Sequence, residues 1–354
     1  MRNLIRTALL LPLAAFGLAV VADRDLPAKA VEPAADTRLE ASRVLPARVL
    51  HESDALAAPT DVEVMGSTLV IADDFAERPL QLMRRSDGAI ERSFGGKGQG
   101  PREFESAWSI DVIDPAGEFM VHDLMLQRVT WVDVREDFED GAWVADRSLK
   151  LKAETMMLET SWTPEGMLGL GILREGRLAH MDRQGAVVRT SGPTPMDGQA
   201  VPPEVRQQAY QSKLKPNPSR TRWAVATRFA DRLEIYDAAG ALVAEGTRRY
   251  GFEPVYEAQR STRAVSMTTG QETRFGYLDL AATEDRIYAL FSGRTRAEGR
   301  ANYGNTVHVF DWSGKMVDVL QLNDYVIALA VDPAGESLYG IRHDPFPAVL
   351  EFPL

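Results

Sequence analysis

The tetrapeptide Asp114-Pro115-Ala116-Gly117 occurs a second time in the chain, as Asp332-Pro333-Ala334-Gly335. The two copies lie 218 residues apart, which fits four repeats of about 54 residues each. Aspartate and glycine suit a tight turn, because the aspartate side chain accepts hydrogen bonds from the backbone two residues on and glycine tolerates positive φ. The repeat therefore predicts that one kind of turn recurs along the chain.

A second class of turn, in which Asp is followed within three residues by Gly, recurs between short runs of alternating apolar and polar residues. These turns are Asp87-Gly88, Asp182 to Gly185, Asp237 to Gly240 and Asp311 to Gly314. The runs predict strands, for example at 69–72, 119–122, 232–236, 287–291 and 307–310. A repeat of about 50 residues with four strands and two tight turns is typical of a propeller blade.

The predicted fold class is therefore all-β, a six-bladed β-propeller. We place the blades at about 59–106, 107–152, 153–192, 209–249, 275–323 and 324–354. The last blade shows only three strands of its own. We expect Ala47 to Glu52, near the N-terminus, to supply its outer strand, because this would close the ring and leave no open sheet edge.

The composition bounds the chemistry of the 354-residue chain. Its residues are 45% hydrophobic and 26% charged, the formal net charge is −11, and cysteine is absent. No disulfide, thiolate nucleophile or cysteine zinc ligand is therefore available. The negative net charge argues against nucleic acid as a partner.

The N-terminus has the pattern of a secretory signal. Arg2 and Arg6 precede an apolar run from Thr7 to Ala22, and Ala28-Lys29-Ala30 offers small residues for cleavage after Ala30, with cleavage after Ala22 or a retained anchor as alternatives. The predicted domains are a signal peptide at 1–30, a flexible segment at 31–41 and the propeller at 42–354. The expected location is the periplasm or the extracellular space, with no membrane span once the signal is removed.

Several segments resemble known propellers. The glycine-rich stretch 95–104 resembles the linkers between blades of NHL-type propellers, and the stretches 231–237, 286–294 and 309–315 resemble the TolB-like six-bladed propeller proteins of bacterial envelopes. The resemblance spans roughly residues 59–354. It implies a periplasmic or surface binding domain and carries no catalytic motif.

Several local motifs favour structural roles. The glycine-rich stretch leads into a strand rather than a helix, so we interpret it as a turn between blades, with Phe104 packed into the seam. Asp123 and Arg128 flank a loop that we expect them to stabilise. His122-Asp123 and His343-Asp344 occupy equivalent places in two blades, but no third histidine completes a metal set, and we predict neither a metal nor a cofactor. The six tryptophans are interpreted as core and seam residues.

The long insertions 193–208, 248–274 and 292–304 should share one face, because strands alternate in direction within a blade. In the first of them we expect a short helix after Pro202-Pro203-Glu204. The last two are rich in arginine. The predicted ligand-binding residues are Arg249, Arg260, Arg263, Arg294, Arg296 and Arg300, which would form a rim for an anionic ligand. The alternative is a solvated loop surface with ordinary ion pairs.

The function predicted from these observations is an exported binding or scaffold propeller. It would recognise a peptide, an acidic glycan or a partner protein of the envelope at the long-loop face, and we predict no catalytic residue. The alternative is a hydrolase or lyase centred on the channel, possibly metal-dependent. A purely structural member of an envelope complex is a third reading.

Overall fold

The computed structural model describes residues 43–139, 142–144, 147–193, 201–260 and 265–354. The predicted signal peptide at 1–30 and the predicted flexible segment at 31–41 lie outside the described residues. No helix in these described ranges is long and apolar enough to cross a membrane.

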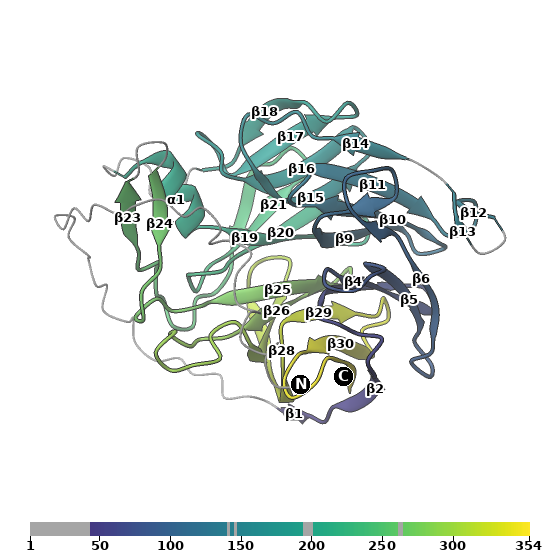
Figure 1. Cartoon of the computed structure of the whole chain (residues 1–354). Coiled ribbons are helices and arrows are strands. Elements are labelled where there is room, and N and C mark those ends of the chain that lie inside the picture. Colours follow the sequence, from purple (N-terminus) through teal and green to yellow (C-terminus); the bar gives the residue numbers. More distant parts are fainter. Residues whose placement is uncertain (1–42, 140–141, 145–146, 194–200, 261–264) are drawn as a thin grey trace.

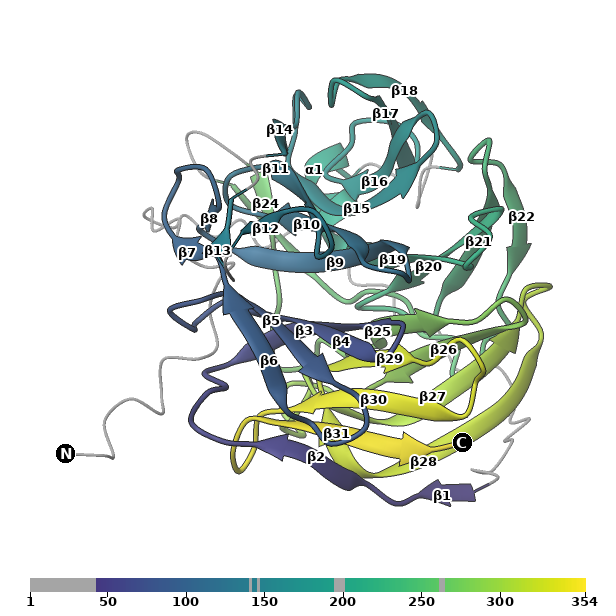
Figure 2. The same cartoon turned by 90° about the vertical axis from the view of Figure 1, so that its right-hand side faces the viewer.

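The described chain forms six blades, each with four antiparallel strands, that follow one another around a ring (Figures 1 and 2), and the fifth carries one additional, parallel strand at its edge. The prediction of a six-bladed β-propeller is confirmed. The first three blades consist of β3 (Pro59–Met65), β4 (Thr68–Asp73), β5 (Leu80–Arg84) and β6 (Ile90–Phe94); β9 (Ala107–Asp114), β10 (Glu118–Asp123), β11 (Arg128–Asp133) and β14 (Ser148–Lys150); and β15 (Met157–Thr163), β16 (Gly166–Gly171), β17 (Leu178–Asp182) and β18 (Val187–Ser191).

The other three blades complete the ring. They consist of β19 (Ser212–Pro216), β20 (Arg222–Thr227), β21 (Leu233–Asp237) and β22 (Leu242–Glu245); β25 (Tyr277–Ala282), β26 (Arg286–Phe291), β27 (Gly304–Asp311) and β28 (Met316–Val326); and β29 (Ala328–Val331), β30 (Ser337–Arg342) and β31 (Ala348–Pro353).

The N-terminal segment closes the ring. β2 (Arg48–Glu52) pairs antiparallel with β31 and supplies the fourth strand of the last blade, as predicted. β1 (Arg43–Leu45) was not predicted, and it pairs parallel with β28 at the edge of the fifth blade. The first residues of the described chain therefore cover the outer edges of two neighbouring blades.

Each blade packs on the next through one hydrophobic cluster. The innermost strands β3, β9, β15, β19, β25 and β29 contact one another around the ring. Six clusters fill the six seams, and one of them joins the last blade to the first, with Leu50 of β2, Val62 and Tyr339 among its buried members. The hydrophobic core is thus a circle of interfaces between sheets.

The predicted turns fall where a propeller requires them. Both Asp-Pro-Ala-Gly turns join the first and second strands of a blade, and the Asp-to-Gly turns join the third and fourth strands. In the former, Gly117 N–H donates to the Asp114 carbonyl at 2.9 Å, and Gly335 N–H donates to the Asp332 carbonyl at the same distance. These turns all lie on one face, which we call the turn face.

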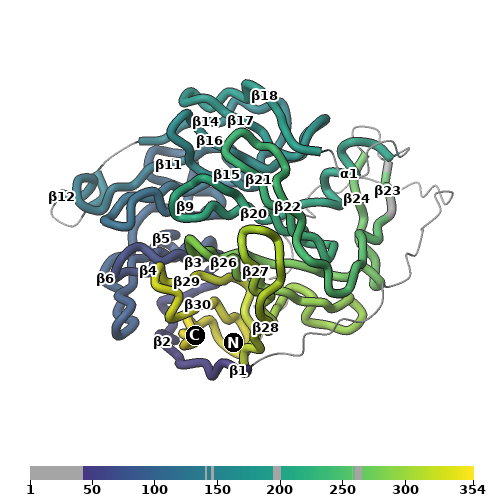
Figure 3. Tube along the Cα trace, turned by 180° about the vertical axis from the view of Figure 1, so that it is seen from behind, coloured from purple at the N-terminus to yellow at the C-terminus, as the bar shows by residue number. Residues whose placement is uncertain are grey.

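Four insertions depart from the repeat. The predicted short helix is α1 (Pro203–Ala209), which lies against β24 of the hairpin β23 (Glu257–Arg260) and β24 (Val265–Thr268) (Figures 1 and 3). β7 (Gly96–Lys97) and β8 (Glu103–Phe104) form a parallel pair within the glycine-rich linker, and β12 (Phe138–Glu139) and β13 (Ala142–Trp143) form a hairpin before β14.

Candidate functional site

The long insertions contact one another on the face opposite the tight turns, which we call the long-loop face. Met267 N–H, in the β23–β24 hairpin, donates to Gln208 Oε1 of α1 at 3.0 Å. Phe275 N–H donates to the Arg294 carbonyl at 2.9 Å, which ties the linker before β25 to the loop after β26. The expectation that these insertions gather on one face is confirmed for their described parts.

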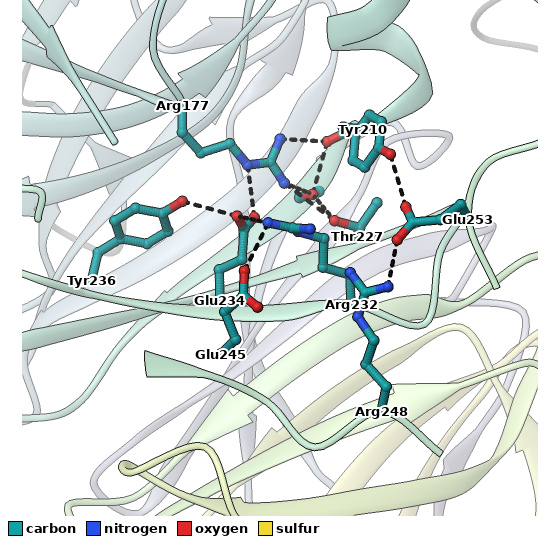
Figure 4. Close-up of polar contacts among 10 residues, drawn as sticks. Arg177, Tyr210, Thr227, Arg232, Glu234, Tyr236, Glu245, Arg248 and Glu253 are labelled. Atoms are coloured by element: carbon teal, nitrogen blue, oxygen red, sulfur yellow. Dashed lines mark hydrogen bonds and ion pairs between the residues drawn. The ribbon is translucent and has the colours of Figure 1, made fainter. Parts of the chain in front are cut away.

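A buried polar network fixes the base of this face (Figure 4). Arg177, which precedes β17, donates to Glu234 Oε2 at 2.9 Å, and the two side chains are only 2% and 0% exposed. Arg177 also donates to the Tyr210 carbonyl at 2.6 Å, just after α1. The Tyr210 hydroxyl in turn donates to Glu253 at 2.8 Å, and Glu253 pairs with Arg248. Blades three and four, α1 and the following linker are therefore held by one chain of contacts.

Burial would raise the pKa of the Glu234 carboxyl, but the guanidinium groups of Arg177 and Arg232 outweigh burial and lower its pKa below the ordinary value. Arg232 contributes a hydrogen bond to Glu234 Oε1 at 3.0 Å, and the Tyr236 hydroxyl donates to the same oxygen at 3.1 Å. The ionised carboxylate is thus matched by donors on both oxygens.

The six predicted arginines have different surroundings. Arg263 lies outside the described residues, and Arg260 ends β23, where it is paired with Val265. Arg294 donates to the Tyr325 hydroxyl at 2.8 Å, and Arg300 pairs with Asp344 at 2.8 Å.

Arg296 and Arg249 make cation–π contacts with aromatic rings. Arg296 lies over the Phe275 ring and Arg249 over the Tyr250 ring, with guanidinium carbons 5.4 and 5.5 Å from the ring centroids. Within the described part of the chain, neither of these arginines nor Arg294 has an ion-pair partner. Arg294, Arg296 and Arg300 thus lie together on the loop after β26, and each contacts an aromatic ring.

Arg228 belongs to the same group, and sequence reasoning missed it. It follows β20, lies over the Phe275 ring that Arg296 also contacts, and donates to Asn302 Oδ1 at 2.8 Å. Burial, together with the charge of Arg296, lowers the pKa of Arg228 to about 10. No local pattern marks this arginine, because its burial comes from linkers far away in the sequence.

Apolar side chains stand exposed on the long-loop face in three consecutive blades. Phe75, Met125 and Phe346 are 61%, 55% and 51% exposed, respectively. They occupy equivalent loops, each between the second and third strands of its blade. Large apolar groups exposed together on a rigid scaffold are typical of an interaction surface.

Charged side chains meet at the centre of the ring. Lys213 on β19 pairs with Glu159 on β15 at 3.1 Å and lies 3.8 Å from Asp279 on β25. Lys215, two residues further along β19, pairs with Glu63 on β3 across the ring. Burial alone would lower the pKa of Lys213, but the carboxylates around it, chiefly those of Glu159 and Asp279, raise its pKa above the ordinary value.

Three aspartates on the inner strands each join their own blade to the next one. The carboxylate of Asp61 accepts the N–H of Ile110 at 2.7 Å, that of Asp111 accepts the N–H of Trp162 at 2.6 Å, and that of Asp279 accepts the N–H of Leu329 at 2.7 Å. Burial raises the pKa of Asp61 to about 7. These three carboxylates thus accept hydrogen bonds from backbone groups of the neighbouring blade.

The loop motifs have the structural contacts expected of them. The carboxylate of Asp123 accepts the backbone N–H groups of Glu105, Ser106, Met125 and Leu126. The Arg128 guanidinium donates to backbone carbonyls of the glycine-rich linker, and Phe104 is fully buried in the seam between the first two blades. The linker presents its carbonyls rather than its N–H groups to the Arg128 guanidinium, so the linker does not form a binding site for an anion.

The two His-Asp pairs considered as metal ligands do not form a metal site. Asp344 pairs with Arg300, and His343 Nε2 lies 2.6 Å from the Pro59 carbonyl oxygen. Both ring nitrogens of the buried His122 lack a hydrogen-bond partner among the described residues. Across the ranges that the structure describes, no three His, Asp or Glu side chains are arranged to hold a metal ion.

Comparison with known proteins agrees with this architecture. A family model described as "TolB-like 6-blade propeller-like" matches residues 41–334. No curated protein matches this chain in sequence. Among solved structures, the β-propeller domain of Cps50 (Swd1) from Myceliophteria thermophila is similar, with a TM-score of 0.47 and 11% identity, covering 86% of this chain and 99% of that one.

Proposed function

The chain belongs to the family of TolB-like six-bladed propellers, and on that premise we propose that it is an exported binding protein whose long-loop face recognises a carboxylate-rich, partly apolar segment of a peptide or partner protein. Residues 1–30 would act as the signal peptide and residues 31–41 as a flexible lead into the propeller. The periplasm or the extracellular space would be its location.

The observation that carries this proposal is the set of arginines without carboxylate partners. Arg249, Arg294 and Arg296 make no ion pair with any described residue, although the protein has a net charge of −11. Arginine beside aromatic rings is well suited to carboxylates, because its planar fork donates two parallel hydrogen bonds and stacking holds it in place. An anionic ligand would supply the missing partners.

The apolar residues of the same face favour a peptide over a bare glycan. Phe75, Met125 and Phe346 lie on blades one, two and six, and the loop of Phe346 adjoins the arginines through the ion pair between Asp344 and Arg300. A ligand that contacts both regions needs carboxylates at one end and apolar side chains at the other. A segment of protein meets that requirement.

The test uses two labelled peptides, one alternating Glu with Leu and one alternating Lys with Leu, and measures binding by fluorescence anisotropy. We expect the Glu peptide to bind better. Replacing Arg294 and Arg296 together by Glu should weaken its binding at least tenfold, which corresponds to about 1.4 kcal/mol.

The matched control for this test is Arg286→Glu, which changes an exposed arginine at the turn face. This variant should bind the Glu peptide as the unmodified protein does. Equal affinity of the two peptides, or full affinity in the double variant, would contradict the proposal. An all-Glu peptide that binds as well as the Glu-Leu peptide would remove the role of the apolar residues.

A further inference from the structure

The turn face carries a second candidate site, a groove of about 360 Å³ between blades two and three. We propose that this groove binds a short, uncharged carbohydrate of one or two sugar rings, stacked on Trp131 and Trp162. The site is independent of the long-loop face, and nothing in the proposed function uses it.

Strand register brings the two tryptophans together from different blades. Trp131 on β11 is opposite Met120, and Trp162 on β15 is opposite Met167. Both methionines lie in the seam between blades two and three, so both indoles lie at that seam too. In Figure 2 the strands β10 and β11 lie beside β15 and β16.

The two indoles are placed differently from the other tryptophans, of which three donate from the indole N–H and the fourth, Trp143, is buried and has no N–H partner among the described residues. The indole N–H groups of Trp108, Trp223 and Trp312 each donate to an oxygen of the protein, at 3.1–3.2 Å. Those of Trp131 and Trp162 have no hydrogen-bond partner in the described part of the chain, and both side chains are partly exposed.

Both rings line the groove, and no ring contact joins them within the described residues. Arg220 lies over the Trp162 ring, 5.5 Å from its centroid, and holds it through a bidentate ion pair to Asp111. Trp162 is therefore a fixed platform with a free N–H.

The polar residues of the groove nearly cancel in charge. Arg147 pairs with Asp137 at 2.8 Å and lies 3.6 Å from Glu118, and Arg183 donates to the Pro164 carbonyl at 2.7 Å. Glu118, Arg147 and Arg183 line the groove together with Thr163, and Asp137 offsets the charge of Arg147 from outside the lining.

The apolar face of a sugar matches the indole faces. Its hydroxyl edge matches the carboxylate, the guanidinium groups and the hydroxyl of the groove. A groove of this size is at the small end of the range of about 300–1,000 Å³ found for ligand pockets. It therefore suits one or two sugar rings, and its balanced charge favours an uncharged sugar.

The experiment measures binding of cellobiose, diacetylchitobiose and digalacturonate to the full protein by calorimetry and by saturation-transfer NMR. We expect at least one of the two uncharged disaccharides to bind with millimolar or better affinity. Trp162→Ala should weaken that binding at least tenfold, and Trp131→Phe should weaken it less, because a smaller ring remains.

Two controls keep the result interpretable. Trp312→Phe changes a partly buried tryptophan at the turn face outside the groove, and it should leave sugar binding unchanged. If Trp162→Ala fails to fold, Trp162→Phe and Arg183→Ala replace it. Arg294→Glu with Arg296→Glu should also leave sugar binding unchanged, so failure of the peptide site and of the sugar site can be told apart.

Absence of binding by all three sugars at millimolar concentration would overturn the inference. Binding that persists in every groove variant would overturn it as well, because the sugar would then be bound elsewhere. Binding of digalacturonate alone would refute the preference for an uncharged ligand.

Discussion

Two buried histidines make the stability of the folded protein depend on pH. His122 and His308 are 1% and 0% exposed, and burial, with the smaller effects of Lys213 and Arg249 respectively, lowers the pKa of each to about 3. An unfolded histidine titrates near 6.5. Between about pH 3 and 6.5 the unfolded chain binds more protons than the folded one, so stability falls as the pH falls through this range.

His308→Phe should reduce that pH dependence. The His308 ring stacks on Phe291 with 4.5 Å between centroids, and Phe fits the same aromatic cluster. Its Nδ1 contact with the Tyr277 hydroxyl would be lost, but Tyr277 keeps its bond to Asp231.

Unfolding in denaturant at pH 7 and at pH 4.5 measures the effect. Each buried histidine should contribute about 1.4 kcal/mol of lost stability per pH unit below 6.5, so between pH 7 and pH 4.5 the variant should lose about 2.5 kcal/mol less than the unmodified protein. An equal loss in both proteins would contradict the assignment.

The turns between the third and fourth strands show why glycine recurs at the scale of elements. Gly88, Gly185, Gly240 and Gly314 have φ between 73° and 85°. Each also touches the outer strand of the preceding blade, and the Gly314 carbonyl accepts the N–H of Thr247 at 2.8 Å. The predicted turn signal is therefore also a contact between blades.

Gly314→Ala should be more destabilising than Gly299→Ala. A Cβ on Gly314 would lie 2.3 Å from the Glu245 carbonyl oxygen, whereas Gly299, with φ of 73°, has nothing within 4 Å. Both substitutions strain the backbone by about 1–2 kcal/mol. Only Gly314→Ala also forces two blades apart, for a total of about 3 kcal/mol. Equal free energies of unfolding for the two variants would show that the contact between blades has no energetic weight.

At the scale of the whole molecule, stability depends on closure of the ring. Leu50 on β2 is buried in the seam between the last and first blades, and His51 Nδ1 lies 2.8 Å from the Gly88 carbonyl oxygen. Without β2, the edge of β31 would be open for pairing with another chain.

A chain that begins at Ser53 should therefore melt at least about 4 °C lower than one that begins at Arg43, since the lost burial of Leu50 alone is worth about 2–3 kcal/mol. It should also aggregate, as light scattering would report. A chain that begins at Ala47 lacks only β1 and should lie between them. An unchanged melting temperature in the chain without β2 would refute the role of this strand in closing the ring.

The sequence by itself determined the all-β class, the six blades, the closing strand and the turns, because turn residues and alternating strands act through neighbours in the chain. It also indicated α1 and the face on which the long insertions gather. β1 and Arg228 were missed because their partners are distant in the sequence. The β12–β13 hairpin was missed because its strands of two residues each are too short to show an alternating pattern.

Only the tertiary structure decided which charges are free. Arg300 has a partner in Asp344 and Arg294 has the Tyr325 hydroxyl, whereas Arg296 shares an aromatic ring with Arg228. The tryptophans divided in the same way, with Trp223 in the core and Trp131 and Trp162 beside a groove. The physical reason is that a side chain's partners across a seam come from another blade, some 50 residues away in a repeat of this length, and no local pattern encodes them.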